Sequence, residues 1–337
     1  MKIQKIYYDK YDITLAQKLK NSQQTYNSRQ GIIVYFENEF YKGKGEAAPL
    51  DGFSKENIND VIWNLESLIS AIELNVEYEF QELLDLITIH CESCPSLHFA
   101  IDTALYDLES QKNNCSLAKL IKTNHRNNIR FSDFYLPNFN LKEIKSNFLK
   151  YKIGINSIKE DLILLNQIAK VKPSINFRID ANQAFEVQNF KKLADKLKNL
   201  NIEYYEEPIS NLSTKNLKLI SNYNIALDES ISNPKFDKWI KDKLIRYVIL
   251  KPSIYGGFKK NLELIEKCNS NNIKIIFSSS LETTIGNMST IHLAATINNP
   301  EFHGINIHNF YTKFNIQPIY SKNQKEICIK NIIGLGV

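Results

Sequence analysis

The chain has 337 residues, of which 43% are hydrophobic and 23% are charged, a composition typical of globular proteins. The formal net charge of +5 is small for this length, and the lysines are scattered among nearly as many acidic residues, which argues against nucleic-acid binding. The sequence has no apolar stretch long enough to cross a membrane, no signal-peptide core, and only one C-x-x-C pair among five cysteines. These features predict a cytoplasmic protein with reduced, structural thiols.

Residues 1–96 predict a small α+β unit. Stretches 31–36 and 40–45 have the pattern of a β-hairpin that turns near residue 38. A helix is expected at 54–72, with Ser54 as its N-cap, because apolar residues recur there at helical spacing. Strands followed by helices are typical of α+β domains. A further helix is expected at 97–110, where the next domain begins.

From residue 130 onward, short apolar strands alternate with helix-like stretches. Strands are expected at 130–136, 147–153, 175–180, 202–206, 224–228, 246–251, 273–278 and 304–308, and helices at 158–171, 187–199, 213–221, 257–269 and 283–296. Eight strands with intervening helices predict a parallel, TIM-like (β/α) barrel over residues 97–310. The segment 311–337 follows the last strand and is expected to pack back on the amino-terminal unit, completing a cap over the barrel.

Polar residues end five consecutive strands of this predicted barrel: Lys152, Asp180, Glu206, Asp228 and Lys251. Each lies about one β/α unit after the previous one, and active sites of such barrels form at the carboxyl ends of the strands. Neighbouring strands are about 5 Å apart, so the three carboxylates are able to converge on one cation. Oxygen ligands without cysteine or histidine suit Mg²⁺, with Mn²⁺ as the second choice.

The two lysines flank the carboxylates from the second and sixth strands, so they are expected to face each other across the metal. Burial, a nearby cation and the like charge of Lys150 would all depress the pKa of Lys152 and make it a base. A metal beside a substrate carboxylate would stabilise the enediolate that forms when the α-proton leaves. The residues therefore predict proton abstraction next to the carboxylate of a small molecule.

The ordered motifs K-x-K, R-x-D-x-N, E-E-P, D-E and K-P-x-x-x-G-G begin at residues 150, 178, 206, 228 and 251. In that order they resemble the enolase superfamily, in its muconate-lactonizing-enzyme-like branch, whose lysine-and-Mg²⁺ sites are well described. The resemblance covers nearly the whole chain. Within the branch, segments 45–54 and 278–286 resemble the o-succinylbenzoate synthases of menaquinone biosynthesis.

The resemblance implies a role for each matching residue. Lys152 would abstract the α-proton and then protonate the departing hydroxyl, in a syn dehydration of 2-succinyl-6-hydroxy-2,4-cyclohexadiene-1-carboxylate to 2-succinylbenzoate. Lys251 would stabilise the enediolate through its charge. The metal ligands would be Asp180, Glu206 and Asp228; Asn182 and Glu229 would orient them; Lys150 and Arg178 would adjust the field near Lys152; and Ser279, Ser280 and Arg29 would contact the substrate. The loop around residues 22–29 and the turn at Gly52 and Phe53 would close over it.

Two alternatives remain, an epimerase or racemase and a non-catalytic barrel, while the sequence argues against a further subgroup of the superfamily. Dipeptide epimerases and N-acylamino acid racemases share the two lysines, but the epimerases carry an acidic D-x-D pair on strand eight, where this chain has Asn306-x-His308. Sugar-acid dehydratases of the superfamily commonly use a histidine after strand seven, where this chain has serines. A non-catalytic, metal-binding barrel would not need the lysine pair. The sequence leaves the oligomeric state open.

Overall fold

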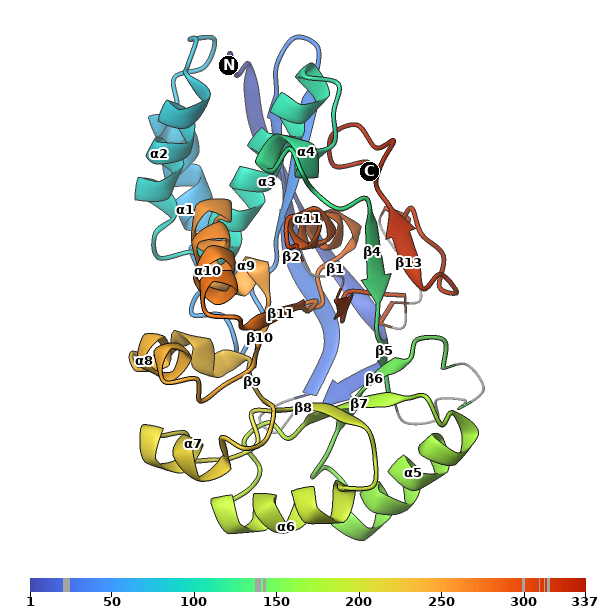
Figure 1. The fold of residues 1–337 in the computed structure, drawn as a ribbon. Coiled ribbons are helices and arrows are strands. Elements are labelled where there is room, and N and C mark those ends of the chain that lie inside the picture. The colour runs from blue at the N-terminus through green and yellow to red at the C-terminus, as the bar shows by residue number, and fades with distance from the viewer. Residues whose placement is uncertain are drawn as a thin grey trace.

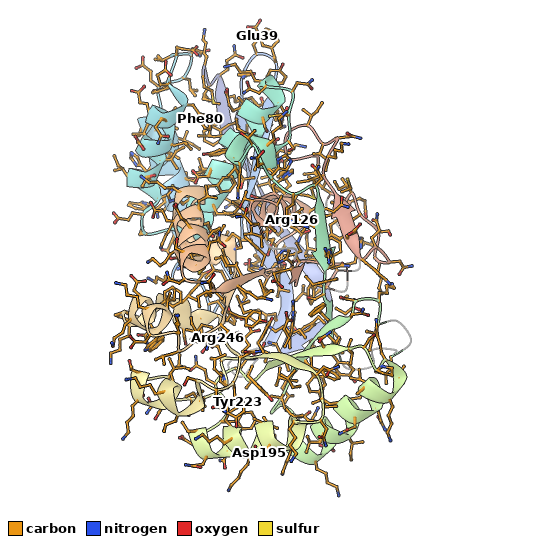
Figure 2. The ribbon with its side chains drawn as sticks, viewed as in Figure 1. Glu39, Phe80, Arg126, Asp195, Tyr223 and Arg246 are labelled. Carbon is orange, nitrogen blue, oxygen red and sulfur yellow. The ribbon has the colours of Figure 1, made fainter. Side chains whose placement is uncertain are left out.

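An amino-terminal unit of sheet and helices lies against a curled parallel sheet that is surrounded by helices (Figure 1). This computed structural model describes residues 1–20, 25–136, 141, 144–298, 301–308, 310–311, 313 and 316–337. The predicted architecture, a (β/α) barrel with an amino-terminal α+β cap, is confirmed. Side chains fill the space between the layers (Figure 2).

The amino-terminal unit is an antiparallel sheet with three helices packed on it. Its strands pair in the order β1 (Lys5–Lys20), β2 (Thr25–Glu37) and β3 (Lys42–Ala47), and its helices are α1 (Ile58–Ala71), α2 (Phe80–Cys91) and α3 (Pro95–Lys112). The predicted N-cap Ser54 was wrong. Asn57 caps α1 through a capping box with Asp60, while the Ser54 hydroxyl accepts a hydrogen bond from the Leu50 amide and closes a turn.

The strands β1 and β2 form a long hairpin that runs from the amino-terminal unit to the mouth of the barrel (Figure 1). Residues 25–29, expected as part of a loop over the substrate, belong to strand β2, and residues 21–24 lie outside the described residues. The hairpin is tied to the far end of the chain, because the Ala16 amide donates to the carbonyl of Phe310.

The barrel is built from two sheets. One has the order β11-β10-β9-β8-β7-β6-β5 and the other has the order β12-β4-β13. The strands are β4 (Asn128–Phe131), β5 (Asp133–Phe134), β6 (Phe148–Lys152), β7 (Asn176–Asp180), β8 (Ile202–Glu206), β9 (Ile225–Leu227), β10 (Tyr247–Leu250), β11 (Lys274–Phe277), β12 (Phe302–His303) and β13 (Glu326–Cys328). A bridge between Ser278 and Gly304 joins β11 to β12, and β12 pairs in parallel with β4, which closes the barrel.

The eighth strand differs from its prediction at 304–308, because it occupies Phe302 and His303 and pairs there with β4. The chain then turns, and the Asn306 side chain accepts a hydrogen bond from the His308 amide, which replaces strand pairing by a local turn. The predicted first strand, 130–136, is divided into β4 and β5, with Ser132 between them.

Helices follow the barrel strands and cover their outer face. They are α4 (Leu117–Ile121), α5 (Ile158–Val171), α6 (Val187–Leu197), α7 (Thr214–Ile220), α8 (Phe236–Lys241), α9 (Pro252–Tyr255), α10 (Phe258–Ser270) and α11 (Thr284–Ala294), together with a 3₁₀ turn, η2 (Glu229–Ser232). Since side chains alternate along a strand, each strand also points residues inward. A small apolar cluster of Tyr204, Ala226, Tyr247, Ile249 and Ile276 fills part of the interior.

The carboxyl-terminal segment contacts several parts of the molecule. Strand β13 pairs antiparallel with β4, the Leu335 amide donates to Asp107 on α3, and the Lys44 ammonium on β3 donates to the Val337 carbonyl. The five cysteines are unpaired. In the part of the chain that the structure describes, every helix is too short or too polar to span a membrane.

Candidate active site

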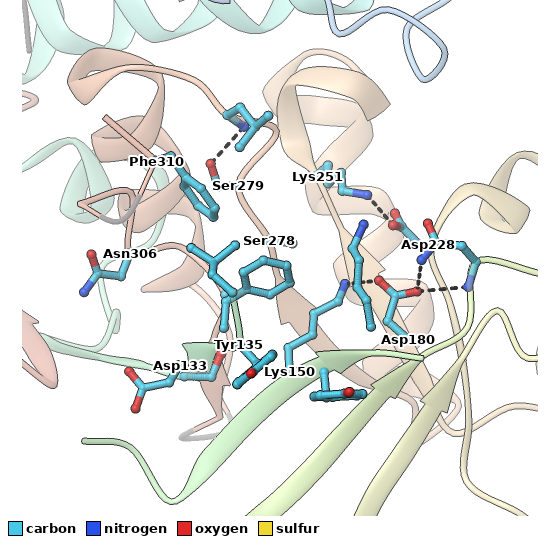
Figure 3. A pocket seen from close by; sticks show the side chains of 18 of the residues that line it. Asp133, Tyr135, Lys150, Asp180, Asp228, Lys251, Ser278, Ser279, Asn306 and Phe310 are labelled. Carbon is cyan, nitrogen blue, oxygen red and sulfur yellow. Dashed lines mark hydrogen bonds and ion pairs between the residues drawn. The ribbon is translucent and has the colours of Figure 1, made fainter. Parts of the chain in front are cut away.

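A cavity of about 410 Å³ opens at the carboxyl ends of the barrel strands. The amino-terminal unit contributes Lys18, Tyr26, Leu50 and Phe53 to its lining, the carboxyl-terminal segment contributes Lys322, and the barrel contributes the rest. Figure 3 shows Asp228 and Lys251 on one side of the cavity and Asp133 and Asn306 on the other. The cavity therefore has two chemically distinct ends, both within reach of one bound molecule.

The structure brings most of the predicted site residues to this cavity. Those that line it are Lys150, Lys152, Asp180, Asn182, Asp228, Lys251 and Ser279. Those that stand behind or beside the lining are Glu206, Arg178, Glu229, Ser280 and Arg29. The first group comes from the ends of β6, β7 and β10 and from the residues that follow β7, β9 and β11, as the spacing predicted.

Strand register places the polar ends in a row. Lys152 is the strand partner of Asp180, and Asp180 is the strand partner of Glu206. The Lys150 ammonium bridges two carboxylates of this row, with its Nζ 3.0 Å from Asp180 Oδ2 and 2.7 Å from Glu206 Oε1. On the opposite side, Lys251 forms an ion pair with Asp228 (Figure 3). Each carboxylate of the row is thus held by a lysine.

The three lysines have different electrostatic surroundings. Burial lowers the pKa of Lys150, but the charges of Asp180 and Glu206 outweigh it and keep the pKa well above its usual value. Burial also lowers the pKa of Lys251, and here Asp228 outweighs it, so the net shift is upward. For Lys152, burial prevails over the attraction of Asp180, and the charges of Lys150 and Lys251 add to it, so its pKa is lowered.

The carboxylates carry more negative charge than their lysine partners neutralise. Burial, followed by the charge of Asp180, raises the pKa of Glu206 to about 8. Burial also raises the pKa of Asp180, but Lys150 and Lys152 reverse the shift and leave it below its usual value. The Glu206 Oε2 atom is buried without a hydrogen-bond partner. Among the described residues, no three His, Cys, Asp or Glu side chains are grouped as a metal site, because these carboxylates turn towards lysines.

Polar neighbours orient the carboxylates. Asn182 donates two hydrogen bonds to Asp180 Oδ1, one from its backbone N–H at 3.1 Å and one from its side-chain Nδ2 at 2.6 Å. Glu229 accepts a 2.9 Å hydrogen bond from Gln183, and its pKa is raised by burial and by Asp228. Arg178 points to a different partner, since its Nε lies 2.5 Å from Glu203 Oε2.

One residue that sequence reasoning did not assign is Glu207. It is fully buried, and it accepts hydrogen bonds from the amides of Asp228 and Ser230 and from the Ser230 hydroxyl. Burial raises its pKa to about 8. Its φ of 40° lies in the left-handed region that side chains seldom adopt. Glu207 therefore fixes the turn that carries Asp228, and its only sequence signal was its place in the E-E-P motif.

The predicted substrate contacts are engaged within the protein. The hydroxyls of Ser279 and Ser280 donate to Glu282 Oε2, at 3.0 Å and 2.9 Å. The Arg29 guanidinium is buried and donates to four backbone carbonyls, those of Ala48, Pro49, Ser280 and Leu281. Arg29 therefore joins the amino-terminal unit to the segment that follows β11.

A second group that the sequence did not point to forms the far end of the cavity. It consists of the aromatic residues Phe134, Tyr135 and Phe310 and the lysines Lys18, Lys145 and Lys322. The aromatic side chains follow the alternating pattern of an ordinary strand, and the lysines resemble any solvated surface, so neither gave a usable signal.

Both parts of the chain match known protein families. The family model described as Enolase C-terminal domain-like matches residues 142–337, more than half of the chain. The chain belongs to the enolase superfamily. A second model, described as MenC, N-terminal domain, matches residues 1–108. Together they cover both the barrel and the amino-terminal unit, and they support the resemblance to the muconate-lactonizing-enzyme-like branch and to o-succinylbenzoate synthases.

Individual proteins give the same superfamily but more than one activity. The o-succinylbenzoate synthase of Aliivibrio salmonicida is 26% identical over 302 residues, which cover 88% of this chain and 87% of that protein. The L-Ala-D/L-Glu epimerase of Thermotoga maritima is 25% identical over 282 residues, covering 79% and 81%. The chain is therefore an enzyme of this superfamily, similar to members with different activities.

Solved structures confirm the fold. The dipeptide epimerase of Enterococcus faecalis V583, complexed with Mg and the dipeptide L-Leu-L-Tyr, has a TM-score of 0.88 at 23% identity, covering 100% of this chain and 99% of that one. The muconate lactonizing enzyme from Pseudomonas putida has a TM-score of 0.84 at 17% identity, covering 100% and 96%.

Proposed function

We propose that this enzyme is an o-succinylbenzoate synthase, which dehydrates 2-succinyl-6-hydroxy-2,4-cyclohexadiene-1-carboxylate to 2-succinylbenzoate and water. The observation that carries the proposal is the unequal state of two lysines on opposite walls of one cavity. The Lys251 ammonium is paired with Asp228, whereas the Lys152 ammonium forms no ion pair or hydrogen bond with any residue that the structure describes. One lysine is thus free to exchange protons, and the other is held as a cation.

This division suits a syn dehydration that needs a single base. Neutral Lys152 would take the proton from the carbon next to the substrate carboxylate, and the electron pair would move into an enediolate. The same ammonium would then protonate the departing hydroxyl, so that water leaves and the ring becomes aromatic. Lys251 would remain charged and stabilise the enediolate from the other face. An epimerase instead needs a second base, and the Asp228 ion pair makes Lys251 a poor one.

The carboxylate row fits a divalent cation. It presents oxygen donors only, Glu206 Oε2 is buried without a partner, and the pKa of Glu206 is raised to about 8 by burial and by Asp180. We propose that Asp180, Glu206 and Asp228 hold Mg²⁺, with Asn182 and Glu229 keeping the ligands in place. When bound, Mg²⁺ would supply positive charge beside the substrate carboxylate.

The far end of the cavity favours a second negative charge on the substrate. Lys145 and Lys322 line that end, together with the neutral Asn306. Asp133 also lies there, but its Oδ2 accepts hydrogen bonds from the amides of Lys145 and Ser146, at 2.6 Å and 2.7 Å. This surrounding matches the succinyl carboxylate, whereas the ammonium group of a dipeptide would meet lysines. The matching MenC amino-terminal family model adds support for the same substrate.

The division of the chain follows from this proposal. We propose a capping domain at 1–96, a catalytic barrel at 97–310 and a carboxyl-terminal segment at 311–337 that packs back on the cap. Helix α3 crosses the first boundary, because it packs on β3 and on α9. Leu50 and Phe53 from the cap line the cavity, so substrate would bind between the first two parts.

A spectrophotometric dehydration assay with the cyclohexadiene substrate and Mg²⁺ tests the proposal. Wild type is expected to turn over, Lys152→Ala and Lys251→Ala are expected to lose at least two orders of magnitude in kcat, and the exposed control Lys159→Ala is expected to match wild type. A chelator should abolish turnover and added Mg²⁺ should restore it.

Two outcomes would overturn the proposal. Turnover that survives in both lysine variants would refute the mechanism. Absence of turnover in wild type, combined with entry of solvent deuterium at the α-carbon of an L-Ala-L-Glu dipeptide, would favour the epimerase alternative.

A further inference from the structure

The cap places an aromatic ring over Lys251, one of the lysines that line the cavity. The Lys251 Nζ lies 4.7 Å from the centre of the Phe53 ring, and it forms an ion pair with the Asp228 carboxylate. We infer that Phe53 is a positioning residue that holds the Lys251 ammonium by a cation–π interaction. The inference rests on the proposed function, in which Lys251 acts as a fixed cation.

The turn that carries Phe53 is built to hold the ring in place. The Phe53 amide donates to the Leu50 carbonyl at 2.9 Å, and the Ser54 hydroxyl accepts from the Leu50 amide at 2.9 Å. Gly52 has a φ of 77°, which a residue with a Cβ adopts only with strain. The Tyr26 hydroxyl donates to the carbonyl of Asp51 at 2.6 Å.

The base of the turn is also fixed. Arg29 donates to the carbonyls of Ala48 and Pro49, directly before the turn, and to those of Ser280 and Leu281 on the barrel. The same guanidinium therefore fixes the turn to the barrel that carries Lys251. Phe53 is presented by a braced loop rather than by a free chain end.

A ring at this position supplies something that Asp228 alone does not. A lysine side chain has a flexible four-carbon stem, so one ion pair at its tip leaves the ammonium free to swing. Only 12% of the Lys251 side chain is exposed, and a desolvated ammonium is attracted strongly to the electron-rich face of an aromatic ring. With Asp228 on one side and Phe53 on the other, the charge is confined to the place where the enediolate would form.

Fluorination of the ring separates this role from simple packing. Each added fluorine withdraws electron density from the ring face while its size hardly changes, so it weakens a cation–π contact selectively. We would incorporate mono-, di- and trifluorophenylalanine at position 53 and measure kcat and KM with the cyclohexadiene substrate. Phe40 provides the control, because it is exposed, lies outside the cavity lining and has no described lysine over its ring.

The expected result is a stepwise fall in kcat with each fluorine at position 53, reaching about 2- to 30-fold for trifluorophenylalanine and for Phe53→Leu. KM should change little, and Phe53→Tyr should retain most of the activity because its ring face is kept. Fluorination at position 40 should leave kcat unchanged. Equal kcat across the Phe53 series, or full activity in Phe53→Leu, would overturn the inference.

A measurement that needs no substrate keeps the inference separate from the proposed function. In protein with ¹³C-labelled lysine, the ring current of Phe53 should shift the Lys251 ε-methylene signal upfield. That signal is assigned by its loss in Lys251→Arg, and it should return towards the ordinary lysine position in Phe53→Leu. An unchanged signal would refute the contact even if the enzyme is active. A shifted signal in an enzyme without dehydratase activity would refute the proposed function alone.

Discussion

Replacing Arg29 with lysine tests two opposed roles for this residue. The sequence resemblance predicts that Arg29 contacts substrate. In the structure its guanidinium is buried and donates hydrogen bonds to four backbone carbonyls. Lysine keeps the positive charge but donates from a single nitrogen, so it cannot bridge the carbonyls of Ala48 and Pro49 to those of Ser280 and Leu281. If Arg29 holds the cap on the barrel, the substitution removes two of the four hydrogen bonds that its guanidinium donates.

The magnitude follows from the bonds that are lost. Two hydrogen bonds from a charged donor contribute about 1.5 to 3 kcal/mol each, so the free energy of unfolding should fall by about 3 to 6 kcal/mol. A natural domain is stable by about 5 to 15 kcal/mol, so the variant should be folded but visibly weakened. The exposed control Arg246→Lys, whose guanidinium donates only to nearby backbone carbonyls, should change stability by less than about 0.5 kcal/mol.

Urea denaturation of both variants at 25 °C measures the stability, and steady-state kinetics measures KM and kcat. A bracing role predicts a large loss of stability in Arg29→Lys, with activity that recovers under stabilising conditions such as added osmolyte. A direct substrate contact predicts a raised KM that no stabiliser corrects. Unchanged unfolding together with a higher KM would refute the bracing role and restore the prediction made from the resemblance.

Three further predictions concern charge. The kcat/KM of the wild type should rise with pH through a midpoint below the usual lysine pKa of about 10.4, because burial lowers the pKa of Lys152 and only its neutral form accepts a proton; a midpoint above that value would contradict it. Lys145→Ala should raise KM several-fold with little change in kcat, because we propose that this lysine meets a non-reacting carboxylate of the substrate, and an equal loss in kcat would count against this. Asp102 is buried and its pKa is raised to about 7, so its ionisation costs stability increasingly as pH rises from about 4 to 7, by up to about 4 kcal/mol. Asp102→Asn should therefore be more stable than wild type at pH 8 and not at pH 4 in paired urea titrations, and a pH-independent difference would refute this.

Local signals explain what the sequence predicted well. Helix α5 begins and ends at the predicted residues, because Ser157 and Glu160 form a capping box and the apolar residues recur at helical spacing. The strand ends were found for a similar reason, since a short apolar run that stops at a charged residue is a local pattern. Their convergence followed from the rule that barrel active sites lie at the carboxyl ends of strands.

Contacts between distant parts of the chain explain what the sequence missed. Arg29 and Leu281 are 252 positions apart, and nothing near either residue indicates that a guanidinium would meet that carbonyl. Glu46 likewise accepts hydrogen bonds from the Thr283 amide and hydroxyl and from the Gly286 amide, far along the chain. Ser279 was predicted from the resemblance to bind substrate, but its hydroxyl donates to Glu282, which lies three residues away on the same loop. A motif identifies residues, but it does not indicate which of their side chains form hydrogen bonds within the protein instead of with a substrate.

The balance of charges at the site suggests how base and metal depend on each other. Three carboxylates face three lysines, but Lys150 is shared by two carboxylates and Lys251 holds the third, which leaves the Lys152 ammonium without a direct partner among the described residues. A divalent cation in the carboxylate row would further disfavour positive charge on Lys152, because it would offset the attraction of Asp180 that now opposes the lowering of its pKa. The metal would therefore help to create the neutral base as well as to stabilise the enediolate. On this reasoning the lysine without a partner is the one suited to move protons.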